Sequence, residues 1–103
     1  MNALPPRELF AAIDAASAPR IVDVRTEREF AAGHVPGAIN VPFHRVGELI
    51  ADPAEPLIVY CGHGPRAWIA GRALRRRGFT AVGYLRGHMA AWRRAELPEE
   101  CSR

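Results

Sequence analysis

The stretch Leu57–Arg66, LIVYCGHGPR, constrains the fold more than any other part of the chain. Its first four residues are apolar or aromatic and include two β-branched side chains, which is typical of a strand buried on both faces. Cys61 follows directly, and two glycines and a proline come next. From Arg66 onward, small and apolar residues recur at helical spacing. The stretch therefore predicts a strand, a tight loop and a helix. Cys61 would lie at the carboxyl end of the strand, where open parallel sheets bind ligands.

Other strands and helices alternate with this unit along the chain. Apolar runs predict strands at 20–24, 38–41 and 81–85. Helical patterns predict helices at about 5–16, 27–32, 46–50 and 87–94. Thr26 is the expected N-cap of the second helix, and Glu27 and Glu29 lie in its first turn. The alternation predicts an α/β fold with a parallel sheet covered by helices on both faces. We expect one domain, 1–103, with a frayed segment from Leu97 onward.

Composition limits the classes of function. All 14 basic residues are arginine, and the net charge of +3 fits an anionic small substrate or an acidic partner, but is too weak to argue for nucleic acid. No apolar run approaches the roughly 18 residues of a membrane-spanning helix, so no membrane partner is expected. Glu8 and Asp14 interrupt the segment that would have to serve as a signal peptide.

The cysteines and histidines argue against a metal site. Two cysteines, far apart in the sequence, are too few for a disulfide framework or a zinc site. The four histidines share no metal-ligand spacing. We therefore expect no metal, no cofactor and a reducing, cytoplasmic setting.

Three features of the loop favour an anionic sulfur at Cys61, whose reactive form is the thiolate. The following helix directs the positive end of its dipole toward the sulfur. Gly62 and Gly64 let backbone N–H groups turn inward as an anion-binding nest, and Arg66 adds a positive charge. A lone cysteine after a strand is more often a small core residue, but the glycines and the arginine reverse that expectation. Cys61 is thus the candidate nucleophile. The candidate binding residues are Gly62, His63, Gly64, Pro65 and Arg66.

The loop and three further segments resemble the rhodanese-like sulfurtransferase family. The loop is similar to the family's Cys-x-x-Gly-x-Arg, which follows a Val-x-Tyr strand. Segments 21–25 (IVDVR), 29–42 (EFAAGHVPGAINVP) and 85–92 (LRGHMAAW) resemble the family's first strand, its Gly-His-Ile-Pro-Gly-Ala-x-Asn-x-Pro signature and its closing Leu-x-Gly-Gly-x-x-x-Trp. The resemblance implies a rhodanese-like open parallel sheet of about five strands with helices on both faces. Two positions depart from the pattern: Pro65 lacks an N–H, and His88 replaces a glycine.

The resemblance also implies a sulfurtransferase that stores sulfur on Cys61 as a persulfide. The thiolate would attack the outer sulfur of thiosulfate or a similar small anionic donor, and a thiophilic acceptor, cyanide or a thiol, would then remove that sulfur. Arg66 and His63 would steer the donor. Asp23 and Arg25 match the family's first-strand motif, and we expect them to be hydrogen-bonding supports.

Two other functions stay open at this point. A phosphatase or arsenate reductase also uses a cysteine loop that ends in arginine, but with five residues between the two. Here four intervene, and the smaller ring suits a single sulfur atom. The second alternative is a sulfur relay or partner-binding module that exchanges persulfide with a protein donor or acceptor. Cys61 argues against an inert module, since inert relatives usually lack the cysteine. We expect no role for Cys101.

Overall fold

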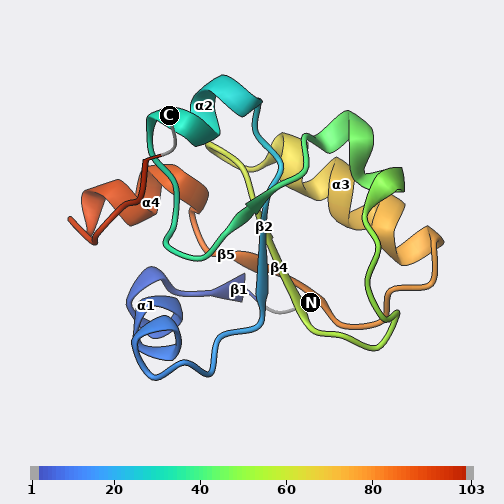
Figure 1. The fold of residues 1–103 in the computed structure, drawn as a ribbon, viewed down its shortest axis with the longest axis horizontal. Helices are drawn as coiled ribbons and strands as arrows, with labels where there is room; N and C mark the ends of the chain where they lie inside the picture. The colour runs from blue at the N-terminus through green and yellow to red at the C-terminus, as the bar shows by residue number, and fades with distance from the viewer. Residues whose placement is uncertain (1–2, 102–103) are drawn as a thin grey trace.

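The structure, a computed structural model, describes residues 3–101 and contains a five-stranded parallel sheet with helices on both faces (Figure 1). The strands are β1 (Ala3–Leu4), β2 (Arg20–Asp23), β3 (Ile39–Asn40), β4 (Leu57–Tyr60) and β5 (Val82–Leu85). The helices are α1 (Pro6–Asp14), α2 (Glu27–Ala32), α3 (Pro65–Arg76), α4 (His88–Arg94) and the 3₁₀ helix η1 (Phe43–Glu48). The strand order is β1-β5-β4-β2-β3 and every pairing is parallel. The predicted α/β fold is confirmed.

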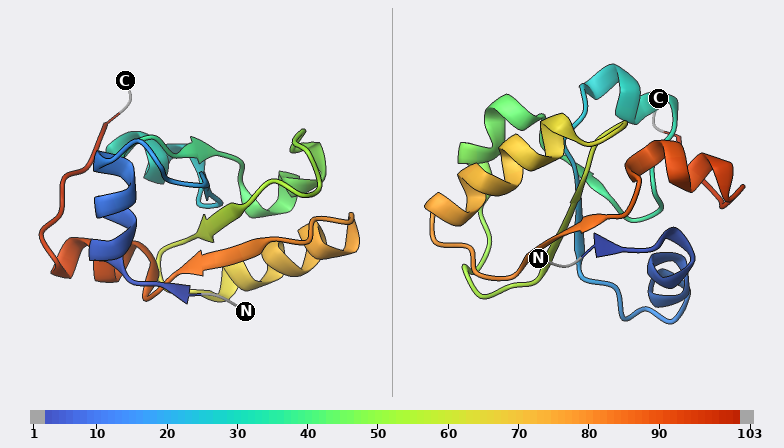
Figure 2. Two further views of the ribbon diagram at one scale, coloured as in Figure 1. Left: turned by 90° about the horizontal axis from the view of Figure 1, so that it is seen from below. Right: turned by 180° about the vertical axis from the view of Figure 1, so that it is seen from behind.

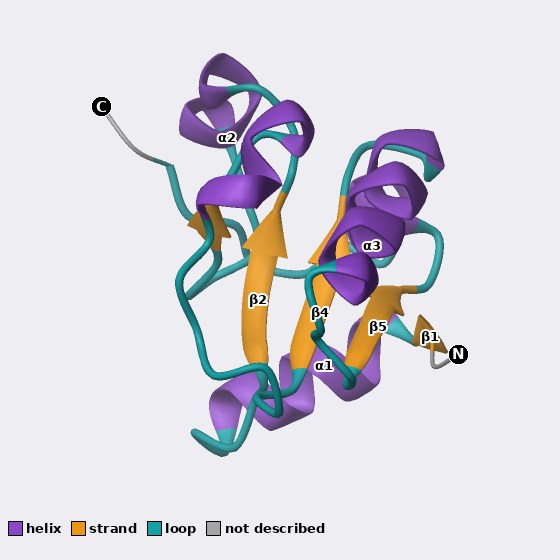
Figure 3. Cartoon of the chain, turned by 90° about the vertical axis from the view of Figure 1, so that its right-hand side faces the viewer, coloured by secondary structure: helices purple, strands orange, loops and turns teal. Residues whose placement is uncertain are grey.

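Alternating side chains of the central strands divide the interior into two cores. In β4, Leu57 and Val59 face the core beneath α3 and η1, whereas Ile58 and Tyr60 face the core beneath α1 and α4. Figure 2 shows these helices on the two sides of the sheet, and Figure 3 shows β2, β4 and β5 pointing the same way, with α3 in front and α1 behind. Cys61 continues the alternation and belongs to the α3 core. The strand period therefore directs its sulfur toward α3.

Two elements differ from the sequence prediction. The edge strand β1 was not predicted, because two residues carry no periodic signal; its pairing with Tyr84 and Leu85 defines it. The helix expected at 46–50 is the 3₁₀ helix η1, which begins at Phe43 after Pro42. The prediction of α2 is confirmed in detail, because Thr26 accepts a hydrogen bond from the Glu29 N–H and forms a capping box.

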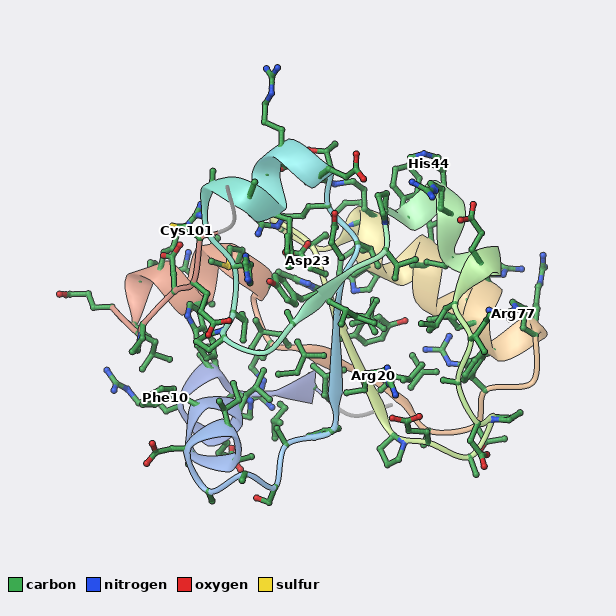
Figure 4. The ribbon with its side chains drawn as sticks, in the orientation of Figure 1. Phe10, Arg20, Asp23, His44, Arg77 and Cys101 are labelled. Carbon is green, nitrogen blue, oxygen red and sulfur yellow. The ribbon has the colours of Figure 1, made fainter. Side chains whose placement is uncertain are left out.

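The prediction of a frayed C-terminal segment is wrong for residues 97–101. The backbones of Glu100 and His34 exchange two hydrogen bonds of 2.9 Å, and the Trp92 indole N–H donates to the Pro98 carbonyl at 2.8 Å. Leu97 packs against the core beneath α1 and α4. Distant hydrogen-bond partners therefore hold a segment whose local sequence is polar. Cys101, labelled in Figure 4, is exposed at this edge of the molecule.

Residues 3–101 contain no helix that is both long and apolar enough to cross a bilayer. In the same part of the chain, no group of three or more His, Cys, Asp or Glu side chains is arranged to hold a metal ion.

Candidate active site

The loop after β4 is clamped between two helices. α3 begins at Pro65, so the loop passes directly into the N-terminus of a 12-residue helix. On the other side, the first turn of α4 binds the loop backbone: the Met89 N–H donates to the Cys61 carbonyl at 2.9 Å, and the Ala90 N–H donates to the Gly62 carbonyl at 3.1 Å. The loop conformation is therefore set by α3, which follows it directly, and by α4, which is distant in the sequence.

Cys61 combines features of a core residue and of an anion site. It is only 1% exposed, in line with a buried cysteine. Its Sγ nevertheless accepts a hydrogen bond of 3.0 Å from the Gly64 N–H at the N-terminus of α3. The predicted nest thus has an inward-pointing amide at Gly64, next to the positive end of the helix dipole.

Gly64 is required by both conformation and space. Its φ of +140° lies in a region that side-chain-bearing residues rarely adopt, and a Cβ there would lie 2.8 Å from the Trp68 ring. Trp68 therefore packs against the loop backbone directly, at the residue whose N–H contacts the sulfur.

Arg66 carries a partner that sequence reasoning missed. Its guanidinium forms a two-point ion pair with Glu29 of α2, with Nη1–Oε1 and Nη2–Oε2 distances of 2.7 and 3.2 Å. The Arg66 hydrogen bond is the main reason that the pKa of Glu29 falls to about 2. The sequence prediction placed Glu29 in the first turn of α2, but no local signal links it to Arg66. The positive charge expected beside Cys61 is thus held by a carboxylate.

Asp23 and Arg25 form the centre of a buried hydrogen-bond network at the carboxyl end of β2. The Arg25 guanidinium donates to Asp23 Oδ2 at 2.7 Å and to the Gly33 carbonyl at 2.7 Å. The Tyr60 hydroxyl also donates to Asp23, at 2.7 Å, and accepts from the Val35 N–H at 3.1 Å. Figure 4 shows Asp23 in the middle of the molecule. The network joins β2, β4 and the segment after α2.

Asp23 stabilises both the charged form of Arg25 and the protonated form of Tyr60. Burial and the negative charge of Asp23 raise the pKa of Tyr60, so the hydroxyl keeps its proton and donates it. Burial opposes the charge on Arg25, but its hydrogen bonds and attraction to Asp23 outweigh that effect and raise its pKa. The two predicted supporting residues, Asp23 and Arg25, thus form an ion pair with each residue at 3% exposure or less.

His88, where the family pattern has glycine, holds the first loop residue. Its φ of +58° is in the left-handed region, which explains why glycine suits this position. Its Nδ1 accepts a hydrogen bond of 3.2 Å from the Cys61 N–H, so this nitrogen carries no proton. Burial, and secondarily the charge of His63, lowers the pKa of His88, which favours the neutral ring that this contact needs.

Two hollows flank the loop, and His63 lines both. The smaller, about 350 Å³, is bordered by Arg25, Arg66, Arg93 and Glu29 on the side of α2 and α4. The larger, about 780 Å³, lies on the side of α3 and β5. Of the predicted loop residues, Gly62, His63 and Arg66 line the smaller hollow, whereas Cys61, Gly64 and Pro65 line neither.

Comparison with known proteins gives concordant matches. The model of the rhodanese-like domain family matches residues 6–95. A sulfurtransferase of Allochromatium vinosum is 37% identical over 82 residues, which are 76% of this chain and 75% of that protein. The thiosulfate sulfurtransferase GlpE of Pseudomonas aeruginosa is 36% identical over 76 residues, with coverages of 72% and 69%. The crystal structure of the Alr3790 protein from Anabaena superposes with a TM-score of 0.86 at 27% identity, covering 94% of this chain and 80% of that one.

Proposed function

This chain belongs to the rhodanese-like domain family, and from that premise we propose that it transfers sulfur through a persulfide on Cys61. Sulfurtransferase activity is the general assignment that the family and its relatives support. Thiosulfate or a similar anion as donor, and a thiol or cyanide as acceptor, are the substrates that we propose. The proposed compartment is the reducing cytoplasm, on the basis of the low cysteine content.

In the proposed donor step, the Cys61 thiolate attacks the outer sulfur of thiosulfate. A bond forms between Sγ and that sulfur, the sulfur–sulfur bond of thiosulfate breaks, and its electron pair leaves with sulfite. The product is a cysteine persulfide that carries one negative charge. Arg25, Arg66 and Arg93 border the smaller hollow, whose size and charge suit this small anion.

The observation that carries the proposal is the 3.0 Å hydrogen bond from the Gly64 N–H to Cys61 Sγ. An amide at a helix N-terminus stabilises negative charge without needing to reorient during the reaction. The same electrostatics support both the attacking thiolate and the persulfide, because each keeps one negative charge on sulfur.

Intact-mass measurement tests the proposal. After treatment with thiosulfate, the wild-type protein is expected to gain the mass of one sulfur atom and to lose it on addition of cyanide. Cys101→Ser is the matched control, because Cys101 is the other free cysteine and is exposed, and the variant is expected to gain the same mass. A persulfide that forms only with a protein persulfide donor would favour the relay alternative. Absence of any gain from thiosulfate and from other sulfane donors would refute the proposal.

Glu29→Gln is expected to lower the KM for thiosulfate by about three- to tenfold at low salt, since the anion no longer competes with a carboxylate for Arg66. With a pKa of about 2, Glu29 stays ionised in any ordinary assay. The ion pair of Glu29 with Arg66 contributes fully to the free energy of unfolding above pH 4.5, the ordinary pKa of the carboxyl group. That contribution is lost as the pH falls through about 2. Steady-state kinetics at several salt concentrations measure the effect, which should shrink as salt rises.

Glu48→Gln is the control for Glu29→Gln, because Glu48 pairs with Arg45 on η1 and does not line the smaller hollow. An unchanged or higher KM in Glu29→Gln would contradict competition and would assign Glu29 to holding Arg66 in place.

A further inference from the structure

The larger hollow adjoins the loop and is separate from the smaller hollow, which we propose as the site of the anionic donor. His63, Gly87 and His88 lie along its border. His88 connects it to the backbone of Cys61, because its Nδ1 accepts from the Cys61 N–H at 3.2 Å. Trp68 connects it to the loop, because its ring packs against Gly64. A molecule bound in this hollow would therefore lie beside the loop, in contact with residues of α3 and β5 and not with α2 or Arg66.

The lining of the larger hollow includes exposed apolar and aromatic side chains. Trp68 and Ile69 are 56% and 57% exposed, although other residues of α3 are buried in the core. The His88 ring lies edge-on to Trp68, with ring centroids 6.2 Å apart, and tilted against Tyr84, with centroids 6.4 Å apart. These rings form a wall against which a flat or apolar body can pack.

The charges of the lining all have one sign. Arg72, Arg75 and Arg86 border the hollow, and among the described residues its lining contains no carboxylate. Arg75 is positioned by Tyr84, whose hydroxyl accepts from its Nη2 at 2.9 Å. Guanidinium groups bind carboxylates and phosphates in two-point contacts. Among the described residues, Arg72 and Arg86 thus line a hollow without a carboxylate, whereas Glu29 lines the smaller hollow.

Size separates the two hollows as well. The larger hollow, about 780 Å³, has more than twice the volume of the smaller, about 350 Å³, and so has room for a larger organic body. A two-step transfer needs a donor and an acceptor in turn, and two hollows with different linings adjoin the loop at His63.

We propose that the larger hollow is the acceptor site and selects a low-molecular-weight thiol carried on an anionic, partly planar or apolar body. This proposal rests on the proposed persulfide at Cys61. The thiol first loses its proton to solvent. Its sulfur then attacks the outer sulfur of the persulfide, a new sulfur–sulfur bond forms, and the bond to Cys61 breaks. The electron pair returns to Sγ as thiolate, and the acceptor leaves as an anionic persulfide.

The test compares two acceptors of the same shape, 4-mercaptobenzoate and 4-mercaptobenzamide. The measured quantity is the ratio of their kcat/KM values, benzoate over benzamide, in each variant, so that the intrinsic reactivity of the two thiols cancels between variants. The charge reversals Arg72→Glu and Arg86→Glu are each expected to lower this ratio by about tenfold. Trp68→Ala is expected to lower kcat/KM for both acceptors and to leave their ratio unchanged.

Arg76→Glu is the matched control, because Arg76 is an exposed arginine of α3 that does not line the hollow. Its ratio should equal that of the wild type. An unchanged ratio in Arg72→Glu and Arg86→Glu, or an equal drop in Arg76→Glu, would overturn the proposal. Sulfur uptake from thiosulfate, followed by intact mass, should be the same in Arg72→Glu, Arg86→Glu and Arg76→Glu as in the wild type. If the wild type itself takes up no sulfur, the proposed function fails instead.

Discussion

Cys61→Ser is expected to reduce kcat/KM for sulfur transfer from thiosulfate by at least about 10⁴-fold, the scale on which enzymes respond to loss of their nucleophile. A serine hydroxyl at this position can accept the same hydrogen bond from the Gly64 N–H, so the loop should keep its conformation. What it cannot do is form a thiolate or hold a second sulfur. The measurement is the rate of sulfite release from thiosulfate, together with intact mass to detect the persulfide.

Two controls make the result specific to Cys61. Cys101→Ser should keep the wild-type rate, because Cys101 is exposed and its Sγ lies beside the Ala32 carbonyl at the C-terminal edge. Thermal unfolding of Cys61→Ser should match the wild type, since the substitution is nearly isosteric in the α3 core. Transfer at more than about a hundredth of the wild-type rate in Cys61→Ser would move the chemistry to another group.

The unit of β4, loop and α3 could be predicted from the sequence because every signal for it is local. Four consecutive apolar residues define β4, and Pro65 begins the helix as its missing N–H allows. Thr26 and Glu29, which lie within one four-residue segment, likewise indicate where α2 begins. From this unit follows the position of Cys61 at the carboxyl edge of the sheet.

Other features depend on contacts between distant residues and left no local signal. The Arg66–Glu29 ion pair joins residues 37 positions apart. The sequence predicted a positive charge of Arg66 beside Cys61, but not the carboxylate that pairs with it. The burial of Cys61 results from packing beneath α3, and the segment after Leu97 is ordered by His34. His88 was visible as a departure from the family pattern, but its contact with the Cys61 N–H required the tertiary fold.

Asp23→Asn is expected to lower the free energy of unfolding by about 3–5 kcal/mol, since it removes one partner of a buried ion pair and leaves the other uncompensated. Asp23 is fully buried, Arg25 is 3% exposed, and the carboxylate accepts from both Arg25 and the Tyr60 hydroxyl. Such a loss is a large part of the stability of a typical small protein, about 5–15 kcal/mol. Urea denaturation followed by circular dichroism measures it.

The same network links stability to the site, so the variant should also affect catalysis. Arg25 borders the smaller hollow and donates to the Gly33 carbonyl, at the end of the helix that carries Glu29. Asp23→Asn should therefore raise the KM for thiosulfate even at temperatures where the protein is folded. The exposed pair of Arg45 and Glu48 is the control, and Glu48→Gln should leave the denaturation midpoint unchanged.

Adding Arg25→Leu to Asp23→Asn should recover part of the stability, because the uncompensated charge is then gone. If the double variant is less stable than Asp23→Asn, the cost lies in lost packing and hydrogen bonds rather than in the buried charge.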